Sequence, residues 1–181
     1  MINAGLLGLG WWGKLIIETL KDSDKIRVTS ASSRTMDKHK KYLEENKINA
    51  FPSYERMLEE NNIDAVIICT PNSQHEDQLA SAIKAKKQVF CEKPMTLSKS
   101  SAENMVRIAD ENDFIIGIGH ERRYDPAIEK LKSIIDDTSF GEKMHIEANW
   151  SHDILASLDN NNWRGSSVEA PAGGMTGTGV H

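Results

Sequence analysis

The chain alternates short apolar runs with amphipathic stretches from its first residues onward. The unbroken apolar run Ala65 to Cys69 is typical of a strand that helices cover on both faces. Further strands are predicted at Asn3 to Leu9, Lys25 to Ala31, Gln88 to Cys91 and Phe114 to Gly119, with a short extended piece around Ala50 and Phe51. The alternation predicts a doubly wound parallel α/β sheet, the Rossmann arrangement.

Helices are predicted between these strands. They run from the glycines near Gly10 through Leu20, from Met36 to Asn46, from Ser53 to Glu60, from Gln74 to Lys84 and from Ser98 to Glu111. Ser53 and Ser98 are the expected N-caps, because a serine hydroxyl accepts a hydrogen bond from the free backbone N–H groups of a first turn.

A different pattern begins near Pro126, which is expected to start a helix that ends at about Ile135. Residues 143–151 are predicted as a strand with Met144, Ile146 and Ala148 on one face. We expect one domain over residues 1–122 and the beginning of a second over 123–181. Because the glycine-rich end at 171–181 lacks a closing helix, we expect the chain to be the N-terminal portion of a longer protein.

Composition narrows the classes of partner. The chain has 181 residues, enough for one core and part of a second, and its formal charge of -5 provides no basic footprint for nucleic acid. No apolar stretch approaches the roughly 20 residues of a membrane helix, and the N-terminus is itself a strand and not a signal segment. We therefore expect a cytoplasmic protein with a small-molecule partner, and predict neither nucleic-acid nor membrane binding. Cys69 and Cys91 are expected to be reduced, packed thiols, and no metal site is predicted.

The first strand leads into a glycine loop, Gly8-Leu9-Gly10-Trp11-Trp12-Gly13. Gly8 permits a tight turn, Gly10 lets the backbone approach a pyrophosphate, and Gly13 lets the helix pack on the strand. The strand, helix and strand around the loop supply the context that a dinucleotide site requires. The alternative is a glycine turn without a ligand. Trp11 and Trp12 either cover the cofactor or pack on the second domain.

A Glu-Lys-Pro tripeptide, residues 92–94, follows the predicted strand that ends at Cys91. Doubly wound sheets hold their ligands at the carboxyl ends of their strands, which favours a functional Lys93 over a solvated lysine. Glu92 either orients Lys93 or a ribose beside the cofactor, or shapes the turn.

These motifs, in the order GLGWWG, AVIICTPNSQHED, CEKPMTLS, GHERRYDPAIEKL and PAGGMTGTGVH, resemble those of the Gfo/Idh/MocA oxidoreductases. The resemblance covers essentially the whole chain. It implies an NAD(P)-binding Rossmann domain followed by a second α/β domain with an open, largely antiparallel sheet, which also supports homo-oligomers. It further implies hydride transfer between a nicotinamide and a sugar, polyol or related hydroxy or keto compound.

In this resemblance the catalytic lysine corresponds to Lys93 and the late histidine to His181, and both contact the substrate. Hydride leaves carbon as the oxygen loses its proton, so a donor steadies the oxygen while a base accepts the proton. A histidine, with its ordinary pKa of about 6.5, suits the second role. The alternative for His181, the last residue of the chain, is a side chain without a role.

The pattern departs from the family at Gly177, where an aspartate usually precedes the histidine by four residues. This departure puts the role of the aspartate in doubt and keeps a regulator open, and in all two alternatives to a dehydrogenase or reductase remain. One is an NAD-dependent glycoside hydrolase of the same fold, and the other is a non-catalytic dinucleotide-binding regulator.

The residues after the second strand bear on cofactor choice. NAD-binding folds tend to carry an acidic residue about 20 positions after the glycine loop, whereas this chain has Ser33 and Arg34. A hydroxyl and a guanidinium suit a 2′-phosphate, which favours NADP while NAD stays open. The alternative for Arg34 is a plain surface position.

Other contacts are predicted from the order of the motifs. Thr70, Pro71, Asn72 and His75 are expected around the nicotinamide ribose, and Arg122 is expected to reach the cofactor. Tyr124, His152 and Trp163 are candidates for the substrate, since aromatic faces suit sugar rings. The alternatives are a surface position for His75, ion pairs with nearby acids for Arg122, and packing roles for the others.

Overall fold

The computed structural model describes residues 1–151, 153 and 162–181, which form two units, Met1–Gly119 and His120–His181. The division falls slightly before Arg122, where the sequence places the end of the first domain. Within the described ranges no helix is long and apolar enough to cross a membrane.

Six parallel strands build the sheet of the first unit. They are β1 (Ile2–Leu7), β2 (Ile26–Ser32), β3 (Asn49–Phe51), β4 (Ala65–Ile68), β5 (Gln88–Cys91) and β6 (Ile116–Ile118), in the spatial order β3-β2-β1-β4-β5-β6. The predicted Rossmann sheet is confirmed. The order reverses between β1 and β4, and such a reversal places a ligand-binding crevice at the carboxyl ends of the two strands.

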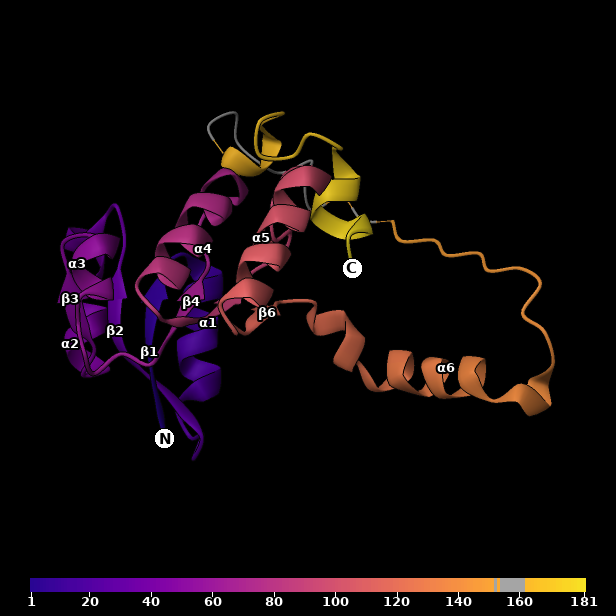
Figure 1. Cartoon of the computed structure of the whole chain (residues 1–181), viewed down its shortest axis with the longest axis horizontal. Helices are drawn as coiled ribbons and strands as arrows, with labels where there is room; N and C mark the ends of the chain where they lie inside the picture. Colours follow the sequence, from indigo (N-terminus) through magenta and orange to yellow (C-terminus); the bar gives the residue numbers. More distant parts are fainter. Residues whose placement is uncertain (152, 154–161) are drawn as a thin grey trace. The chain divides into compact units, whose positions relative to one another are not determined.

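Helices cover the sheet on both faces (Figure 1). One core joins the sheet to α1 (Trp11–Leu20) and α2 (Lys40–Glu45), through side chains such as Ile17 and Leu43. The other joins it to α3 (Tyr54–Leu58), α4 (His75–Lys84) and α5 (Lys99–Glu111), and α4 and α5 lie side by side. Along β4, Val66 and Ile68 enter the second core while Ile67 enters the first, which is why its sequence is apolar without a break.

Local sequence explains where these helices begin. The side chains of Ser53 and Ser98 accept hydrogen bonds from the backbone N–H groups of Arg56 and Ser101, so both predicted caps are confirmed. The helix predicted from Met36 begins instead with a 3₁₀ turn, η1 (Met36–His39), before α2, and a second such turn, η2 (Asn72–Gln74), precedes α4. Such tighter turns are frequent at helix ends, and apolar periodicity does not distinguish them from α-helix.

The second unit contains α6 (Pro126–Asp136) and short turns. Asp125 caps α6 by accepting a hydrogen bond from the backbone N–H of Ala127. The turns are η3 (Glu121–Tyr124), η4 (Thr138–Phe140), η6 (Trp163–Gly165) and the single π-helical turn η7 (Met175–Gly179).

The strand predicted at 143–151 is not formed in this structure. All nine of its residues are exposed and irregular, and the described part of the unit has no sheet. An apolar alternation gives a strand only when a neighbouring strand supplies the ladder of hydrogen bonds.

A buried lysine, Lys87, lies at the amino ends of the strands, opposite the ligand-binding crevice. The Nζ atom of Lys87 donates hydrogen bonds of 2.8 Å to the carbonyl oxygens of Glu60 and Ile63, in the turn between α3 and β4. Only 9% of the residue is exposed. The ammonium group thus joins two backbone carbonyls of the turn that follows α3.

Replacing this lysine should therefore be costly. We predict that Lys87→Met lowers the free energy of unfolding by about 1.5–3 kcal/mol, because two charge-assisted hydrogen bonds in a buried place are lost. Urea unfolding followed by circular dichroism measures the change. The control is Lys84→Met, at an exposed lysine that ends α4. Equal midpoints for the two variants would contradict the prediction.

Candidate functional site

The glycine turn lies where three strands end. The backbone N–H of Gly8 donates a 3.0 Å hydrogen bond to the carbonyl of Ser32 at the end of β2. Gly8 has φ of +96°, and a Cβ atom there would lie 2.5 Å from the carbonyl oxygen of Cys69, just past β4. Both its conformation and its surroundings exclude a side chain, so the predicted role of Gly8 in the tight turn is confirmed.

The other two glycines of the loop have different surroundings. A Cβ at Gly13 would collide with the carbonyl oxygen of Gly8, so the close packing predicted for this glycine is confirmed. Gly10, the N-cap of α1, is extended with φ of -69° and ψ of -177°, and no atom lies within 4 Å of the position its Cβ would take. Open space therefore faces the free N–H groups of the first turn of α1, where a helix favours anions.

The two tryptophans of the loop have different environments. Their ring centres are 5.1 Å apart with the planes at 74°, and Trp11 is 64% exposed. The Nε1 atom of Trp12 is buried and has no hydrogen-bond partner among the described residues. A buried donor without a partner costs free energy, so this N–H group is suited to an acceptor from outside the chain.

The turn after β5 holds Lys93. The backbone N–H of Glu92 donates a 2.9 Å hydrogen bond to the carbonyl of Ile68, so this turn lies beside the end of β4. The Glu92 carboxylate accepts a 3.3 Å hydrogen bond from the backbone N–H of Lys93 and occupies the space over Gly119, where a Cβ would lie 2.6 Å from Oε1. Lys93 itself is partly buried and is followed by a cis peptide bond to Pro94.

His75 connects two of these loops. Its side chain is fully buried, with Nδ1 at 2.7 Å from the carbonyl oxygen of Pro94 and Nε2 at 3.1 Å from that of Thr70. A neutral ring donates to one of these carbonyls, and a protonated ring donates to both. The surface position considered for His75 is therefore wrong. A direct contact with the cofactor stays a prediction, and the structure adds a bridging role.

The remaining predicted residues of the first unit also lie at the carboxyl ends of the strands. Thr70 donates a 2.6 Å hydrogen bond to the Oε1 atom of Gln78, and Pro71 and Asn72, which follow it, are partly buried. Ser33 and Arg34 come directly after β2, with Ser33 partly buried and Arg34 exposed. Cofactor contacts for these residues stay predictions.

Both cysteines are free thiols, Cys69 just after β4 and Cys91 at the end of β5. Burial raises the pKa of Cys69 and of Cys91, and the nearby charge of Glu92 raises both further. Neutral, buried thiols are unreactive. The prediction of reduced, packed cysteines is confirmed.

The candidates in the second unit form separate contacts. The Arg122 guanidinium lies 5.0 Å from the ring centre of Trp150, and its Nε is 3.6 Å from Oε1 of Glu121, the ion pair considered as an alternative role. Tyr124 is 76% exposed, and Trp163 stacks with Arg164 at 4.3 Å. His152 lies outside the described residues.

His181 is not a dangling end in this structure. Only 12% of its side chain is exposed, and Nδ1 lies 3.6 Å from Oε2 of Glu121. The ring of His120 packs edge-on against it, with the centres 5.9 Å apart and the planes at 85°. Neither neighbour was predicted from the sequence. They lie in the quoted segment GHERRYDPAIEKL, but only the fold of this unit brings them to His181.

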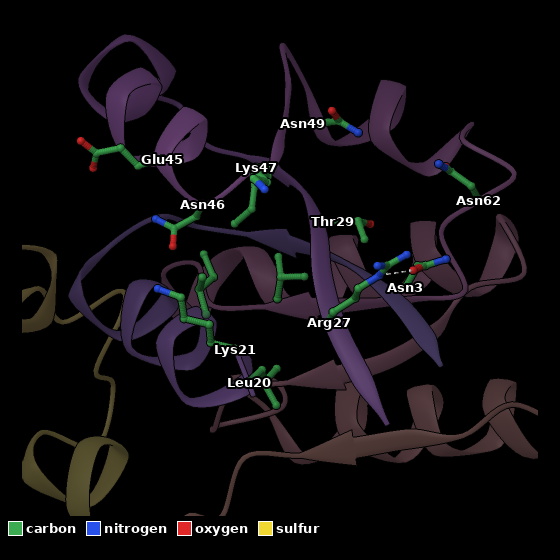
Figure 2. Close-up of a pocket in the computed structure, with 13 residues that line it drawn as sticks. Asn3, Leu20, Lys21, Arg27, Thr29, Glu45, Asn46, Lys47, Asn49 and Asn62 are labelled. Carbon is green, nitrogen blue, oxygen red and sulfur yellow. Dashed lines mark hydrogen bonds between the residues drawn. The ribbon is translucent and has the colours of Figure 1, made fainter. Parts of the chain in front are cut away.

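A pocket of about 630 Å³ lies near the amino ends of β1 and β2, away from the Gly8 turn (Figure 2). Asn3 and Arg27 line it near the starts of β1 and β2, and Oδ1 of Asn3 accepts a 3.0 Å hydrogen bond from Nε of Arg27. Because all strands are parallel, this pocket and the Gly8 turn lie at opposite strand ends. The pocket is therefore separate from the candidate site.

Comparison with known proteins agrees with this geometry. Residues 2–120 match the model of the GFO_IDH_MocA family, described as an oxidoreductase family with an NAD-binding Rossmann fold. Myo-inositol 2-dehydrogenase of Thermotoga maritima is 31% identical over 80% of this chain and 43% of its own length. D-xylose 1-dehydrogenase [NADP(+)] of Haloarcula marismortui is 29% identical over 90% of this chain and 47% of its own length. The chain thus spans about half the length of these curated relatives.

Solved structures are similar as well. A crystal structure described as an NADPH-dependent oxidoreductase from Desulfitobacterium hafniense superposes with a TM-score of 0.89 and 29% identity, over 99% of this chain and 52% of that one. Scyllo-inositol dehydrogenase from Lactobacillus casei, with bound NAD(H) and scyllo-inositol, has a TM-score of 0.72 and 26% identity over 78% and 43% of the two chains.

The bridge made by His75 has a measurable consequence. We predict that His75→Ala raises amide hydrogen exchange about 10- to 100-fold in the loops 69–74 and 92–96, because two carbonyls lose the group that joins them. Exchange followed by mass spectrometry measures the change, with β2 as the internal reference. His145→Ala, at an exposed histidine of the second unit, is the control. Unchanged exchange in both loops would show that the bridge contributes nothing.

Proposed function

Since this chain belongs to the Gfo/Idh/MocA oxidoreductase family, we propose that it is the nucleotide-binding part of an NAD(P)-dependent enzyme that oxidises a hydroxyl of a sugar or polyol, or reduces the corresponding carbonyl. The observation that carries the proposal is the glycine cradle. A Cβ atom at Gly8 or Gly13 would collide with the backbone, whereas the space beside Gly10, at the N-terminus of α1, is open.

The residues present fit a dinucleotide. The open space at Gly10 admits a pyrophosphate against the N–H groups of α1, and the buried Nε1 of Trp12 is a donor that lacks an acceptor among the described residues. When bound, the nicotinamide supplies the hydride acceptor or donor. Everything else in the reaction depends on groups that hold the substrate oxygen and move its proton.

Lys93 and His181 are proposed for those two tasks. In the direction of oxidation, the hydride leaves the carbon while the hydroxyl proton passes to a nitrogen of His181, and the C–O bond becomes a carbonyl. The Lys93 ammonium donates a hydrogen bond to the oxygen as negative charge develops on it. Support for Lys93 comes from its turn after β5, which is fixed by Glu92 and by the bridge from His75 to Pro94.

NADP is proposed over NAD as the preferred cofactor. Ser33 and Arg34 follow β2, where a carboxylate would bind a free 2′-hydroxyl and repel a 2′-phosphate. Cationic groups lie near the η1 turn just beyond: burial lowers the pKa of His39, and the nearby charges of Lys14 and Lys38 lower it further. The one D-xylose relative is described as NADP-dependent, whereas the L. casei structure holds NAD(H), so the family accommodates both cofactors.

Substrate class follows from the relatives and is part of the proposal. Inositols and D-xylose are cyclic compounds with several vicinal hydroxyls, and they define the compounds to test first. A second domain with an open antiparallel sheet, homo-oligomers of the complete protein, a cytoplasmic location, and substrate contacts from Tyr124, His152 and Trp163 stay predictions from the sequence.

The direct test is turnover by the complete protein. A panel of inositols and aldoses is offered as substrates. We expect at least one of them to support reduction of NADP, followed at 340 nm. Lys93→Met should lower kcat by about 10²-fold or more while the affinity for the dinucleotide changes little. Hydrolysis of a glycoside without net cofactor reduction would favour the NAD-dependent glycoside hydrolase. Tight dinucleotide binding with no turnover of the panel would favour the regulator.

The glycine cradle predicts a separation between binding and stability. Gly10→Ala should weaken NADPH binding about tenfold or more, because the new methyl group enters the space that faces the phosphates, while the free energy of unfolding changes by less than about 1 kcal/mol. Gly13→Ala should lower the free energy of unfolding by about 1–3 kcal/mol, because its methyl group meets the Gly8 carbonyl.

Fluorescence titration and urea unfolding measure the two quantities, and the pair of variants makes each the control for the other. Undiminished NADPH binding by Gly10→Ala would contradict the placement of the phosphates at α1.

The proposed preference for NADP depends on Arg34. We predict that Arg34→Gln weakens NADPH binding about 10- to 100-fold and leaves NADH binding within about twofold, because a hydrogen-bonded ion pair with the 2′-phosphate is worth about 1.5–3 kcal/mol. Arg27→Gln, at the opposite edge of the sheet, is the matched control and should change neither affinity. Equal losses for both dinucleotides would contradict a 2′-phosphate contact.

A further inference from the structure

The pocket at the amino ends of β1 and β2 has the features of a second ligand site. Its volume of about 630 Å³ is typical of a small-molecule site, and residues of α1, β2 and the end of α2 surround it (Figure 2). Ile17, Leu20 and Val28 form part of its wall. The described lining also includes four asparagines, three cationic residues, Thr29 and Glu45. None of these residues belongs to the candidate dinucleotide site.

A shift in the strand register brings Thr29 to this pocket. Ala4 of β1 pairs with Val28, and the next residue, Gly5, pairs with Ser30. Thr29 therefore has no partner on β1. Neighbouring residues of a regular strand point to opposite faces, yet Val28 and Thr29 both line the pocket. An extra residue of this kind redirects a side chain, and such bulges are frequent beside functional sites.

Thr29 also carries a polar group that lacks a partner. Its Oγ1 atom is buried and has no hydrogen-bond partner among the described residues. A buried hydroxyl that bonds to nothing costs free energy, so valine would serve packing better at this position. The residue as a whole is only partly buried, and a rotation about its Cα–Cβ bond brings the hydroxyl to the pocket. A ligand oxygen there supplies the missing partner.

Two other polar side chains of the lining are already oriented. Nε of Arg27 donates a 3.0 Å hydrogen bond to Oδ1 of Asn3, while its terminal nitrogens have no partner among the described residues (Figure 2). Asn3 is held in turn by Asp64, whose carboxylate accepts a 2.8 Å hydrogen bond from the backbone N–H of Asn3. Nδ2 of Asn46 donates a 2.8 Å bond to the carbonyl of Tyr42, which directs its Oδ1 elsewhere. Groups oriented in advance lose little entropy when they bind a ligand.

The pocket has an excess of positive charge, although the whole chain has a formal charge of -5. Lys21, Arg27 and Lys47 line it, and Glu45 is the single acid among its described lining residues. The Glu45 carboxylate lies 3.8 Å from Lys41, outside the lining, and Lys21 pairs with an acid of its own helix. Arg27 and Lys47 have no ion pair within the described part of the chain. These two cations therefore favour an anion from outside the protein.

We propose that this pocket binds a small anion that carries several hydroxyl groups, such as a phosphorylated sugar or a sugar acid. The anionic group lies against Arg27 and Lys47, and the hydroxyls lie against Asn46 and Thr29. Amides and hydroxyls both donate and accept, so they match the hydroxyls of such a ligand. The volume also exceeds what an inorganic anion alone would fill. The site is separate from the dinucleotide site and does not depend on the proposed function.

Isothermal titration calorimetry of the complete protein tests the proposal. Saturating NADPH is present, so that a phosphate does not enter the dinucleotide site. The ligands titrated are glucose 6-phosphate and gluconate, with glucose and inorganic phosphate as the two halves of the first. We expect glucose 6-phosphate, gluconate or both to bind about tenfold more tightly than either half, because only the complete ligand contacts both the cations and the amides.

Variants locate the binding. Arg27→Gln should weaken it about 10- to 100-fold, because a charge-assisted hydrogen bond is lost, whereas Lys41→Gln removes the same charge outside the lining and should change it less than about threefold. Thr29→Val should weaken binding about three- to tenfold without lowering the midpoint of urea unfolding, since it replaces a hydroxyl that has no partner. Thr19→Val, at an exposed threonine of α1, is its control and should leave binding unchanged.

Three results would overturn the proposal. The first is an absence of binding for both glucose 6-phosphate and gluconate. The second is an equal loss of affinity in Arg27→Gln and Lys41→Gln, which would indicate only a general attraction between charges. The third is undiminished affinity in both Arg27→Gln and Thr29→Val, which would place the bound ligand elsewhere. Because the readout is binding and not turnover, the result stands whether or not the proposed reaction is found.

Discussion

The close approach of the β1–α1 turn to the end of β4 is the constraint on which the candidate site depends. At Gly8 the two backbones are so near that a single Cβ atom would lie 2.5 Å from the Cys69 carbonyl oxygen, and one helical turn later Gly13 contacts Gly8 in the same way. Backbone packed on backbone has no side chain that can adjust. The N-terminus of α1 is therefore fixed relative to the sheet, and Gly10 faces open space at the point where the strand order reverses.

This constraint extends across the sheet through hydrogen bonds and not through further glycines. The loop after β4, which limits Gly8, is joined by the buried ring of His75 to the carbonyl of Pro94, and the same turn after β5 is tied to β4 by the backbone of Glu92. Three loops that are far apart in the sequence are thus joined to one another. A side chain such as Lys93 can serve chemistry only if its backbone is held in this way, because a misplacement of about 1 Å costs a large part of the rate.

Most of the first unit could be predicted from the sequence because its signals are local. Apolar runs gave the strands within a residue or two, and Ser53 and Ser98 marked the helix starts that the structure has. The roles of Gly8 and Gly13 could be predicted because the spacing of the glycines decides which one forms the turn and which one packs on the strand. What the sequence did not indicate was non-local: His75 was predicted beside the cofactor, with a surface position as the alternative, and only the fold shows that its ring lies between two carbonyls from different loops.

The second unit also shows that a local pattern does not determine non-local contacts. The alternation at 143–151 indicates which side chains would share a face, but a strand exists only if another strand pairs with it, and here all of those residues are exposed. A search at fixed spacing likewise finds no carboxylate before His181, because Gly177 stands at the expected place. The neighbours of a histidine ring, however, are set by the fold and not by a fixed spacing in the sequence. In this unit the carboxylate of Glu121, from a turn far earlier in the sequence, lies 3.6 Å from Nδ1 of His181, and no local pattern in the sequence indicates that neighbour.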